Sequence, residues 1–339
     1  MNLVAKETQI VKEVLENDFS KIDAGGADLH KILKSADNNR VLYQFSLNLK
    51  DHLTQSSRNH PWIAGLDVVL KNCRREMDLL KKTLIFINDF FARSRKEFMV
   101  IKTFRSMPFV TLDVDTLVKG EDFEEVKGIL GKYDHEEFGS NPTLQPHMKM
   151  KDTLIIDLHH ELTWKREDFF DNDLTWKDPR EVLIEGIPVF VPNLEVEVML
   201  LISHLFRERW QITLLELLYL KSVSPSVNWD LILAQAAKYG WLYLFKRVAS
   251  LINSINRKLY KDSCDVIPVT NANYRIFMPL SLPYVFTPHL AMETFFAWKK
   301  KVTFYEFAYY CYCLLAYNFT RGDKVPIYRH FEYFDNSNL

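Results

Sequence analysis

Hydrophobic and polar residues alternate along two stretches in the middle of the chain. Residues 109–118 (FVTLDVDTLV) place Asp113 and Asp115 between apolar neighbours. Residues 153–162 (TLIIDLHHEL) place Asp157 in the same way. An alternation with period two is typical of a β-strand that has one apolar and one polar face. The pattern therefore predicts two strands, each with aspartate on its polar face.

The residues on both sides of these strands have the spacing of amphipathic helices. Before residue 95, apolar residues recur near every third or fourth position, most clearly over 62–94. From Pro192 onward the pattern is again helical, with Asn193 as the cap of the first helix. The predicted fold class is α+β, a small mixed β-sheet core flanked by N-terminal and C-terminal helical regions. We expect three regions, with bounds at 1–95, 96–190 and 191–339.

Shorter elements complete the predicted core. Asp122 and Glu125 form a capping-box pattern at the start of a helix that is expected over 122–130. Three further strands are expected over 98–102, 132–139 and 144–151. A tight turn at residues 151–152 would join the last of these to the Asp157 strand.

The three aspartates carry the candidate chemistry. In a strand, residues two apart share a face, so Asp113 and Asp115 project together about 6–7 Å apart. Such a pair is unfavourable in a buried setting unless a cation lies nearby, and carboxylate oxygens favour a hard ion. If the Asp157 strand lies beside the first, three carboxylates face one site for Mg²⁺ (or Mn²⁺). Such a set suits phosphoryl or nucleotidyl transfer.

The same residues resemble a known superfamily. Lys102-Thr103, the LDVDTLV run at 112–118 and the IDLH run at 156–159 are similar to the polymerase-β-type nucleotidyltransferases, in particular an uncharacterised bacterial and archaeal branch. The EVEVMLL run at 195–201 is similar to the helical region after that core. The resemblance implies a metal-dependent transfer of NMP from NTP to an unidentified acceptor. It also implies that the catalytic metal ligands are Asp113, Asp115 and Asp157.

One departure from the superfamily concerns phosphate binding. Members usually have Gly-Ser or Gly-Gly where this chain has Lys102-Thr103. Glycine allows the backbone to approach a phosphate closely, whereas threonine adds a branched side chain. Lys102 or Arg105 would compensate by contacting phosphate as a cation. The expected nucleotide-binding residues are Lys102, Thr103, Arg105 and His159.

The two histidines after Asp157 have different expected roles. His159 shares the face of Asp157, so it would contact phosphate or hold the third aspartate in place. His160 is expected on the opposite, core-facing side as a structural residue.

Composition and charge limit the partners. Hydrophobic residues make up 47% and charged residues 26% of the 339 residues, as in ordinary globular proteins. Four cysteines without framework spacing favour a cytoplasmic setting, and the longest apolar stretch, 302–319, is too short and polar for a membrane span. Residues 106–200 contain 9 basic and 21 acidic residues, a net charge of −12. A long nucleic-acid substrate is therefore not favoured, although the flanks are more basic.

Two other functions stay open. One is a toxin-like nucleotidyltransferase that modifies tRNA or a protein. The other is a non-catalytic scaffold of the same fold, because a fold does not imply a function. The acceptor is thus a small molecule, a protein or tRNA.

Overall fold

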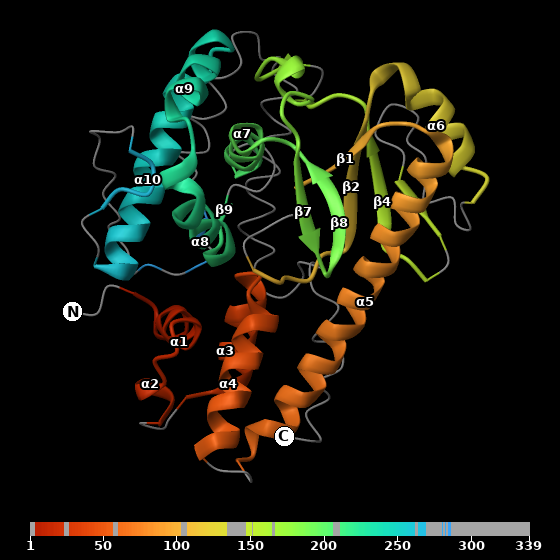
Figure 1. Cartoon of the computed structure of the whole chain (residues 1–339). Helices are drawn as coiled ribbons and strands as arrows, with labels where there is room; N and C mark the ends of the chain where they lie inside the picture. Colours follow the sequence, from red (N-terminus) through yellow and green to blue (C-terminus); the bar gives the residue numbers. More distant parts are fainter. Residues whose placement is uncertain are drawn as a thin grey trace, which may run out of the picture. The chain divides into compact units, whose positions relative to one another are not determined.

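The computed structural model of the protein describes residues 4–23, 27–56, 60–102, 107–133, 147–150, 152–164, 167–205, 211–261, 264–268, 280, 282 and 284–285. The chain folds into two compact units, each assembled from separated stretches of sequence (Figure 1). Unit 1 contains Met1–Val69, Leu205–Leu214 and Gly240–Leu339. Unit 2 contains Leu70–His204 and Leu215–Tyr239. Contacts between segments distant in sequence therefore build both units.

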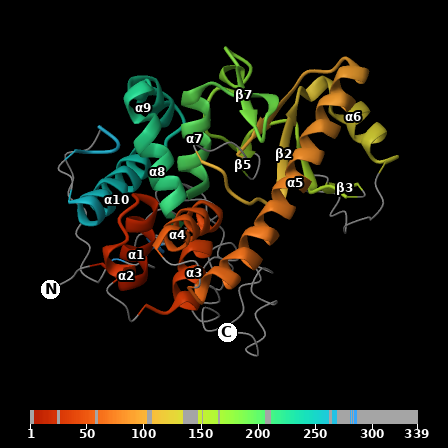
Figure 2. The same ribbon diagram turned by 60° about the horizontal axis from the view of Figure 1, so that its bottom comes forward.

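Unit 1 is helical in its described part. Its helices are α1 (Lys6–Leu15), α2 (Ser20–Asp23), α3 (Leu29–Asn38), α4 (Leu42–Ser56), the first part of α5 (Trp62–Ser94) and α10 (Leu242–Tyr260). Helices α1, α3 and α4 pack against one another (Figure 2). The residues between them are buried, among them Ile10, Val11, Leu33, Phe45 and Leu49. The described part of the unit also contains a short antiparallel pair, β9 (Gln211–Ile212) with β10 (Tyr284–Val285).

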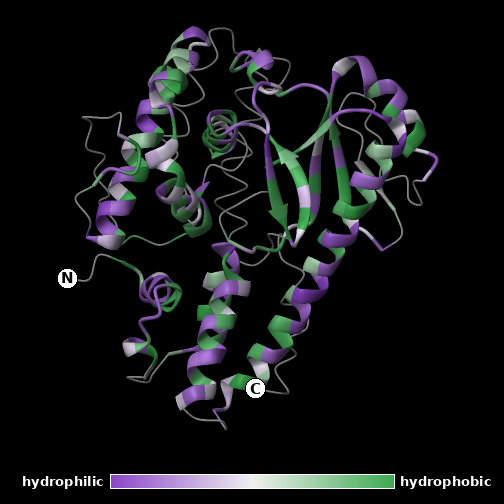
Figure 3. Ribbon diagram, viewed as in Figure 1, coloured by the Kyte–Doolittle hydropathy of each residue, from purple (hydrophilic) through white to green (hydrophobic). Residues whose placement is uncertain are grey.

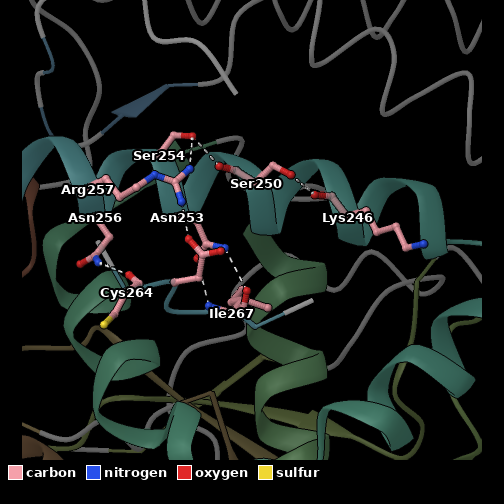
Figure 4. Close-up of polar contacts among 9 residues, drawn as sticks. Lys246, Ser250, Asn253, Ser254, Asn256, Arg257, Cys264 and Ile267 are labelled. Carbon is pink, nitrogen blue, oxygen red and sulfur yellow. Dashed lines mark hydrogen bonds and ion pairs between the residues drawn. The ribbon is translucent and has the colours of Figure 1, made fainter. Parts of the chain in front are cut away.

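Buried asparagines join separated segments of unit 1. The side-chain nitrogen of Asn39 donates to the carbonyl of Leu282 at 2.8 Å, and its oxygen accepts from the backbone N–H of Leu214 at 3.0 Å. On α10, the amide of Asn253 exchanges two hydrogen bonds with the backbone of Ile267, both at 2.9 Å (Figure 4). These side-chain amides serve as hydrogen-bond partners for buried backbone N–H and C=O groups. Such a group destabilises the fold if it is buried without a partner.

Unit 2 contains the predicted mixed sheet. Its strand order is β1-β2-β4-β3. Strands β2 and β4 are parallel, and the two outer pairs are antiparallel. The connection from β2 to β4 includes η1 (Gly120–Asp122) and α6 (Phe123–Leu130). The bounds of the strands are β1 Phe98–Ile101, β2 Asp113–Val118, β3 His147–Lys149 and β4 Ile155–His159.

Helix α5 covers one face of this sheet and forms its core. Leu80, Leu84 and Ile87 of the helix pack against Val114 of β2 and Ile156 of β4. Figure 3 shows that α5 carries both hydrophobic and hydrophilic positions along its length. Its apolar positions face the sheet, as the sequence pattern predicts. The α+β class and the helix over 62–94 are thus confirmed.

The remainder of unit 2 follows the sheet in the chain. It comprises β5 (Thr163–Trp164), β6 (Glu167–Asp168), η2 (Asn172–Leu174), β7 (Arg180–Ile184), β8 (Ile187–Val191), α7 (Leu194–His204), α8 (Leu214–Val223, of which Leu214 belongs to unit 1), η4 (Ser224–Ser226) and α9 (Trp229–Lys238). Strands β7 and β8 form a hairpin that the sequence pattern did not predict. Its two-residue loop, Glu185-Gly186, has positive φ at both positions (50° and 77°), which is the conformation such tight hairpins need.

Some local predictions hold and others are wrong. Asn193 does cap α7, since its side-chain oxygen accepts from the N–H of Val196 at 3.0 Å. Strands β3 and β4 are antiparallel neighbours, as a turn between them requires, and Asp152 has φ +60°, but Lys151, the other residue of the predicted turn, lies outside the described residues.

The capping box at α6 is wrong. Asp122 makes no side-chain cap, because Asp122 and Glu125 both bind Lys96 instead, each at 2.8 Å. A long lysine side chain nearby offers these carboxylates a full positive charge, which a helix N-terminus does not.

Two strand predictions are also revised. The strand expected over 109–118 begins only at Asp113. Of the strand expected over 132–139, residues 132 and 133 lie in a turn, and the rest is outside the described residues. Among the helices that the structure describes, none is long and apolar enough to cross a membrane.

Candidate active site

The sheet brings the three predicted aspartates to one face. Strands β2 and β4 pair in parallel so that Asp115 lies directly opposite Asp157, while Asp113 pairs with Ile155. Paired residues of neighbouring strands project from the same face of a sheet. The other face carries the apolar residues that pack with α5, among them Val114, Val118, Ile156 and Leu158. The prediction that the Asp157 strand lies beside the Asp113–Asp115 strand is confirmed.

Asp115 is at the centre of this acidic face. Asp115 is 9% exposed, and its Oδ1 accepts hydrogen bonds from two side chains. His159 Nε2 lies 2.7 Å away and Lys102 Nζ lies 3.3 Å away. Burial by itself would raise the pKa of Asp115, but the charge of Lys102 and the hydrogen bond from His159 outweigh it and hold the pKa well below its ordinary value. Asp115 is therefore ionised at neutral pH.

Asp113 has a different neighbour. The hydroxyl of Thr111 lies 3.2 Å from Asp113 Oδ1 and 3.1 Å from the Asp113 backbone oxygen. Thr111 is buried, so this contact restrains the Asp113 side chain. Thr111 was not among the predicted site residues. Strand alternation could not have found it, because Thr111 lies before β2, which begins at Asp113.

Lys102 follows β1 directly and has φ +59°, in the left-handed region. That conformation is common for glycine and uncommon for lysine. Lys102 therefore has a backbone conformation that suits glycine, the residue that the resemblance leads one to expect at this position. Thr103 and Arg105, the other predicted phosphate contacts, lie outside the described residues.

The two histidines after Asp157 have unlike environments. His159 ends β4, is 3% exposed, and forms a hydrogen bond with Asp115 of the neighbouring strand. His160 was expected to face the core, and this is wrong. It is exposed, and its ring lies 4.4 Å from the ring of Phe123, centroid to centroid. The strand ends at His159, so the alternation that places side chains on opposite faces no longer applies to the next residue.

The acids at the start of α7 have structural contacts. Glu197 is 4% exposed and forms an ion pair with Arg180 at 2.7 Å. Glu195 accepts a hydrogen bond from the backbone N–H of Asn228 at 2.9 Å. These contacts tie α7 to the β7 strand and to the start of α9, so both acids serve the framework beside the sheet.

The donor chemistry of the acidic face fits a hard divalent cation. Three carboxylates project from adjacent strands, and carboxylate oxygens are preferred by Mg²⁺ and Mn²⁺. Within the described part of the chain, no group of three or more His, Cys, Asp or Glu side chains is gathered closely enough to hold a metal ion. Asp115 Oδ1 instead faces the ammonium of Lys102. The convergence of the three aspartates on one ion stays a prediction, as do their catalytic roles.

Comparison with known proteins adds a family match to this geometry. A family model described as "Uncharacterised nucleotidyltransferase" matches residues 111–255. No curated protein and no solved structure matches the chain. The match supports a nucleotidyltransferase assignment, and this class of enzyme uses an NTP and transfers NMP. The matched segment contains four of the predicted site residues, Asp113, Asp115, Asp157 and His159.

Proposed function

We propose that the protein is a metal-dependent nucleotidyltransferase of the polymerase-β type, which transfers NMP from NTP to an acceptor hydroxyl or phosphate. The observation that carries the proposal is the acidic face of the sheet. Asp115 and Asp157 lie opposite each other on parallel strands, with Asp113 on the same face, inside the segment that the family model matches.

Asp113, Asp115 and Asp157 would hold Mg²⁺ or Mn²⁺. When bound, the ion neutralises the triphosphate and stabilises the charge that develops on the transferred phosphate. The protein's part is to keep the carboxylates ionised and oriented. His159 and, before the nucleotide arrives, Lys102 do so for Asp115, and the hydroxyl of Thr111 orients the Asp113 side chain.

Asp157 would also act as the base. The acceptor oxygen loses its proton to Asp157 as it bonds to the α-phosphorus of the NTP. The bond from that phosphorus to the bridging oxygen breaks, and pyrophosphate leaves with the electron pair. A carboxylate suits this role when it lies within hydrogen-bond reach of the attacking oxygen. Lys102, Thr103 and Arg105 would face the triphosphate as it leaves.

The acceptor is proposed to be a small molecule, a protein or tRNA. The net charge of −12 over residues 106–200 disfavours a long nucleic acid that must approach the face without other support. A cytoplasmic location suits this substrate, because nucleoside triphosphates are abundant there.

The direct test is incubation of the full chain with each α-labelled NTP in the presence of Mg²⁺ or Mn²⁺. Pyrophosphate release and the class of labelled product in a cell lysate are measured. We expect metal-dependent pyrophosphate release that Asp113→Ala abolishes. Asp122→Ala is the matched control, because Asp122 belongs to the same unit but binds Lys96. Equal label transfer by Asp113→Ala and the wild type would refute the proposal, and no transfer by either would favour the scaffold.

A further inference from the structure

Lys102 combines two features that its proposed contact with the triphosphate does not explain. It holds a left-handed backbone conformation at φ +59°, and its ammonium lies 3.3 Å from Asp115 Oδ1. Residue 102 also precedes the segment that the family model matches, which begins at residue 111. The family match therefore does not extend to Lys102.

We propose that Lys102 prevents a divalent ion from binding to the acidic face before the nucleotide does. Its ammonium contacts Asp115 Oδ1 in place of the ion until it moves to bind the triphosphate. The divalent ion would then enter together with the nucleotide and not before it. This inference rests on the proposed function, since it concerns how the same carboxylates receive their metal.

Lys102 and a divalent ion would compete for one oxygen of Asp115. A divalent ion binds a carboxylate oxygen at about 2.1 Å, and its charge repels an ammonium that contacts the same atom. Asp115 Oδ1 already accepts from His159 at 2.7 Å and from Lys102 at 3.3 Å. A metal ion can use this oxygen only after the ammonium has moved.

Of the two side chains that contact Asp115 Oδ1, Lys102 is the one able to move. Its contact is longer than the 2.7–2.9 Å usual for a charged hydrogen bond, and its side chain is 23% exposed. A lysine has a flexible four-carbon stem and binds phosphate as a point charge. His159 is 3% exposed at the end of β4, so it keeps Asp115 in place when the lysine leaves.

The ion pair with Asp115 also bears on the backbone conformation of Lys102. A left-handed residue other than glycine is unfavourable and persists only where its surroundings hold it. At Lys102 the ion pair with Asp115 supplies such a restraint directly after β1. A glycine would adopt this conformation without strain but would leave Asp115 without its cation. Lysine here is therefore suited to a carboxylate that must be neutralised before the nucleotide arrives.

The test measures Mn²⁺ binding by electron paramagnetic resonance on the full chain, without turnover. Wild type, Lys102→Met and Lys102→Gly are compared, with and without a non-hydrolysable triphosphate. Without nucleotide, we expect both variants to bind Mn²⁺ at least about 5-fold more tightly than the wild type. With the triphosphate, the wild type should gain Mn²⁺ affinity and the variants should gain less. Lys119→Met is the matched control, since Lys119 pairs with Glu97 just beyond the end of β2, and it should behave as the wild type.

Unchanged Mn²⁺ affinity in both Lys102 variants without nucleotide would overturn the inference. The Lys102→Gly variant guards against misfolding, because glycine relieves the positive φ. Failure of the proposed function has a different signature. In that case neither the wild type nor any variant binds Mn²⁺ with the triphosphate present, or Asp115→Asn binds it as well as the wild type does.

Discussion

Asp115 in unit 2 and Asp37 in unit 1 are carboxylates with similar burial and opposite behaviour. Asp115 is 9% exposed and Asp37 is 5% exposed. Burial alone raises the pKa of Asp37 to about 7. Burial also acts to raise the pKa of Asp115, but Lys102 and His159 outweigh this effect and lower the pKa. At similar burial, the hydrogen-bond and cationic partners of a carboxylate decide whether it carries charge.

This difference separates a site from a structural residue. An ionised carboxylate on the acidic face of the sheet attracts a cation or a phosphate-bound metal. A carboxyl group that is protonated near neutral pH within a helical unit does not. The two residues also respond in opposite directions to pH, so each can be tested against the other.

The largest expected effect is on catalysis by the acidic face. Asp115→Asn keeps the size of the side chain but removes the charge that Lys102 and His159 hold in place. We expect pyrophosphate release to fall at least about 100-fold, which corresponds to about 3 kcal/mol in the barrier. Initial rates at saturating NTP measure it. Asp37→Asn should leave the rate unchanged, and an equal loss in both variants would remove the distinction between them.

The second prediction concerns stability and pH. The folded-state pKa of Asp37, about 7, lies above the unfolded value of 3.8, so the folded state binds the proton more tightly. The contribution of Asp37 to the free energy of unfolding is therefore largest below about pH 4 and is lost as the pH rises from there through 7. The difference of about 3 units sets an upper bound of about 4 kcal/mol at pH 8.

Urea unfolding at pH 5.5 and pH 8 measures this effect. Asp37→Asn should be more stable than the wild type at pH 8 and should gain less at pH 5.5. The exposed Asp51 on α4 of the same unit provides the control, as Asp51→Asn. Asp115 contributes in the other direction. Its lowered pKa stabilises the fold above about pH 4 and ceases to do so only as the solution becomes strongly acidic.

The third prediction tests a buried polar contact that has no charge. Asn253→Ala leaves the backbone N–H and C=O of Ile267 without the amide that binds both. A buried orphaned group costs about 1–3 kcal/mol, so we expect a loss of about 2 kcal/mol in the free energy of unfolding. Ser250→Ala removes only a hydroxyl bond to Lys246 in the same helix and should cost less (Figure 4). A larger loss for Ser250→Ala would contradict the bridging role of Asn253.

The smallest expected effect is at Thr111. Thr111→Val removes the hydroxyl that contacts Asp113 Oδ1 and keeps the side-chain shape. A single long hydrogen bond of 3.2 Å contributes about 1 kcal/mol, so the rate should fall about 5-fold. Thr111→Ser should retain most of the wild-type rate, since serine keeps the hydroxyl. A rate for Thr111→Val equal to that of the wild type would show that Asp113 is positioned without it.

Periodicity predicted the parts of the molecule that depend on neighbouring residues in the chain. The spacing of apolar residues located α5 at residues 62–94, and alternation put Asp113 and Asp115 on the polar side of a strand. Hydrophobic burial rewards these repeats wherever the element packs, so local pattern alone is sufficient. The hairpin of β7 and β8 was missed although its Glu-Gly loop is a recognisable turn signal.

The identity of each charged group's partner required the folded chain. Lys102 and His159 meet at one oxygen of Asp115 although they lie 13 and 44 residues from it. Lys96 binds Asp122 from 26 residues away and so displaced the predicted cap. Unit 1 likewise joins the first 69 residues to segments after residue 204. The face on which a side chain projects follows from the dihedral angles of its own helix or strand. Its partners depend on which distant segments pack together, and the spacing of residues along the chain does not specify that packing.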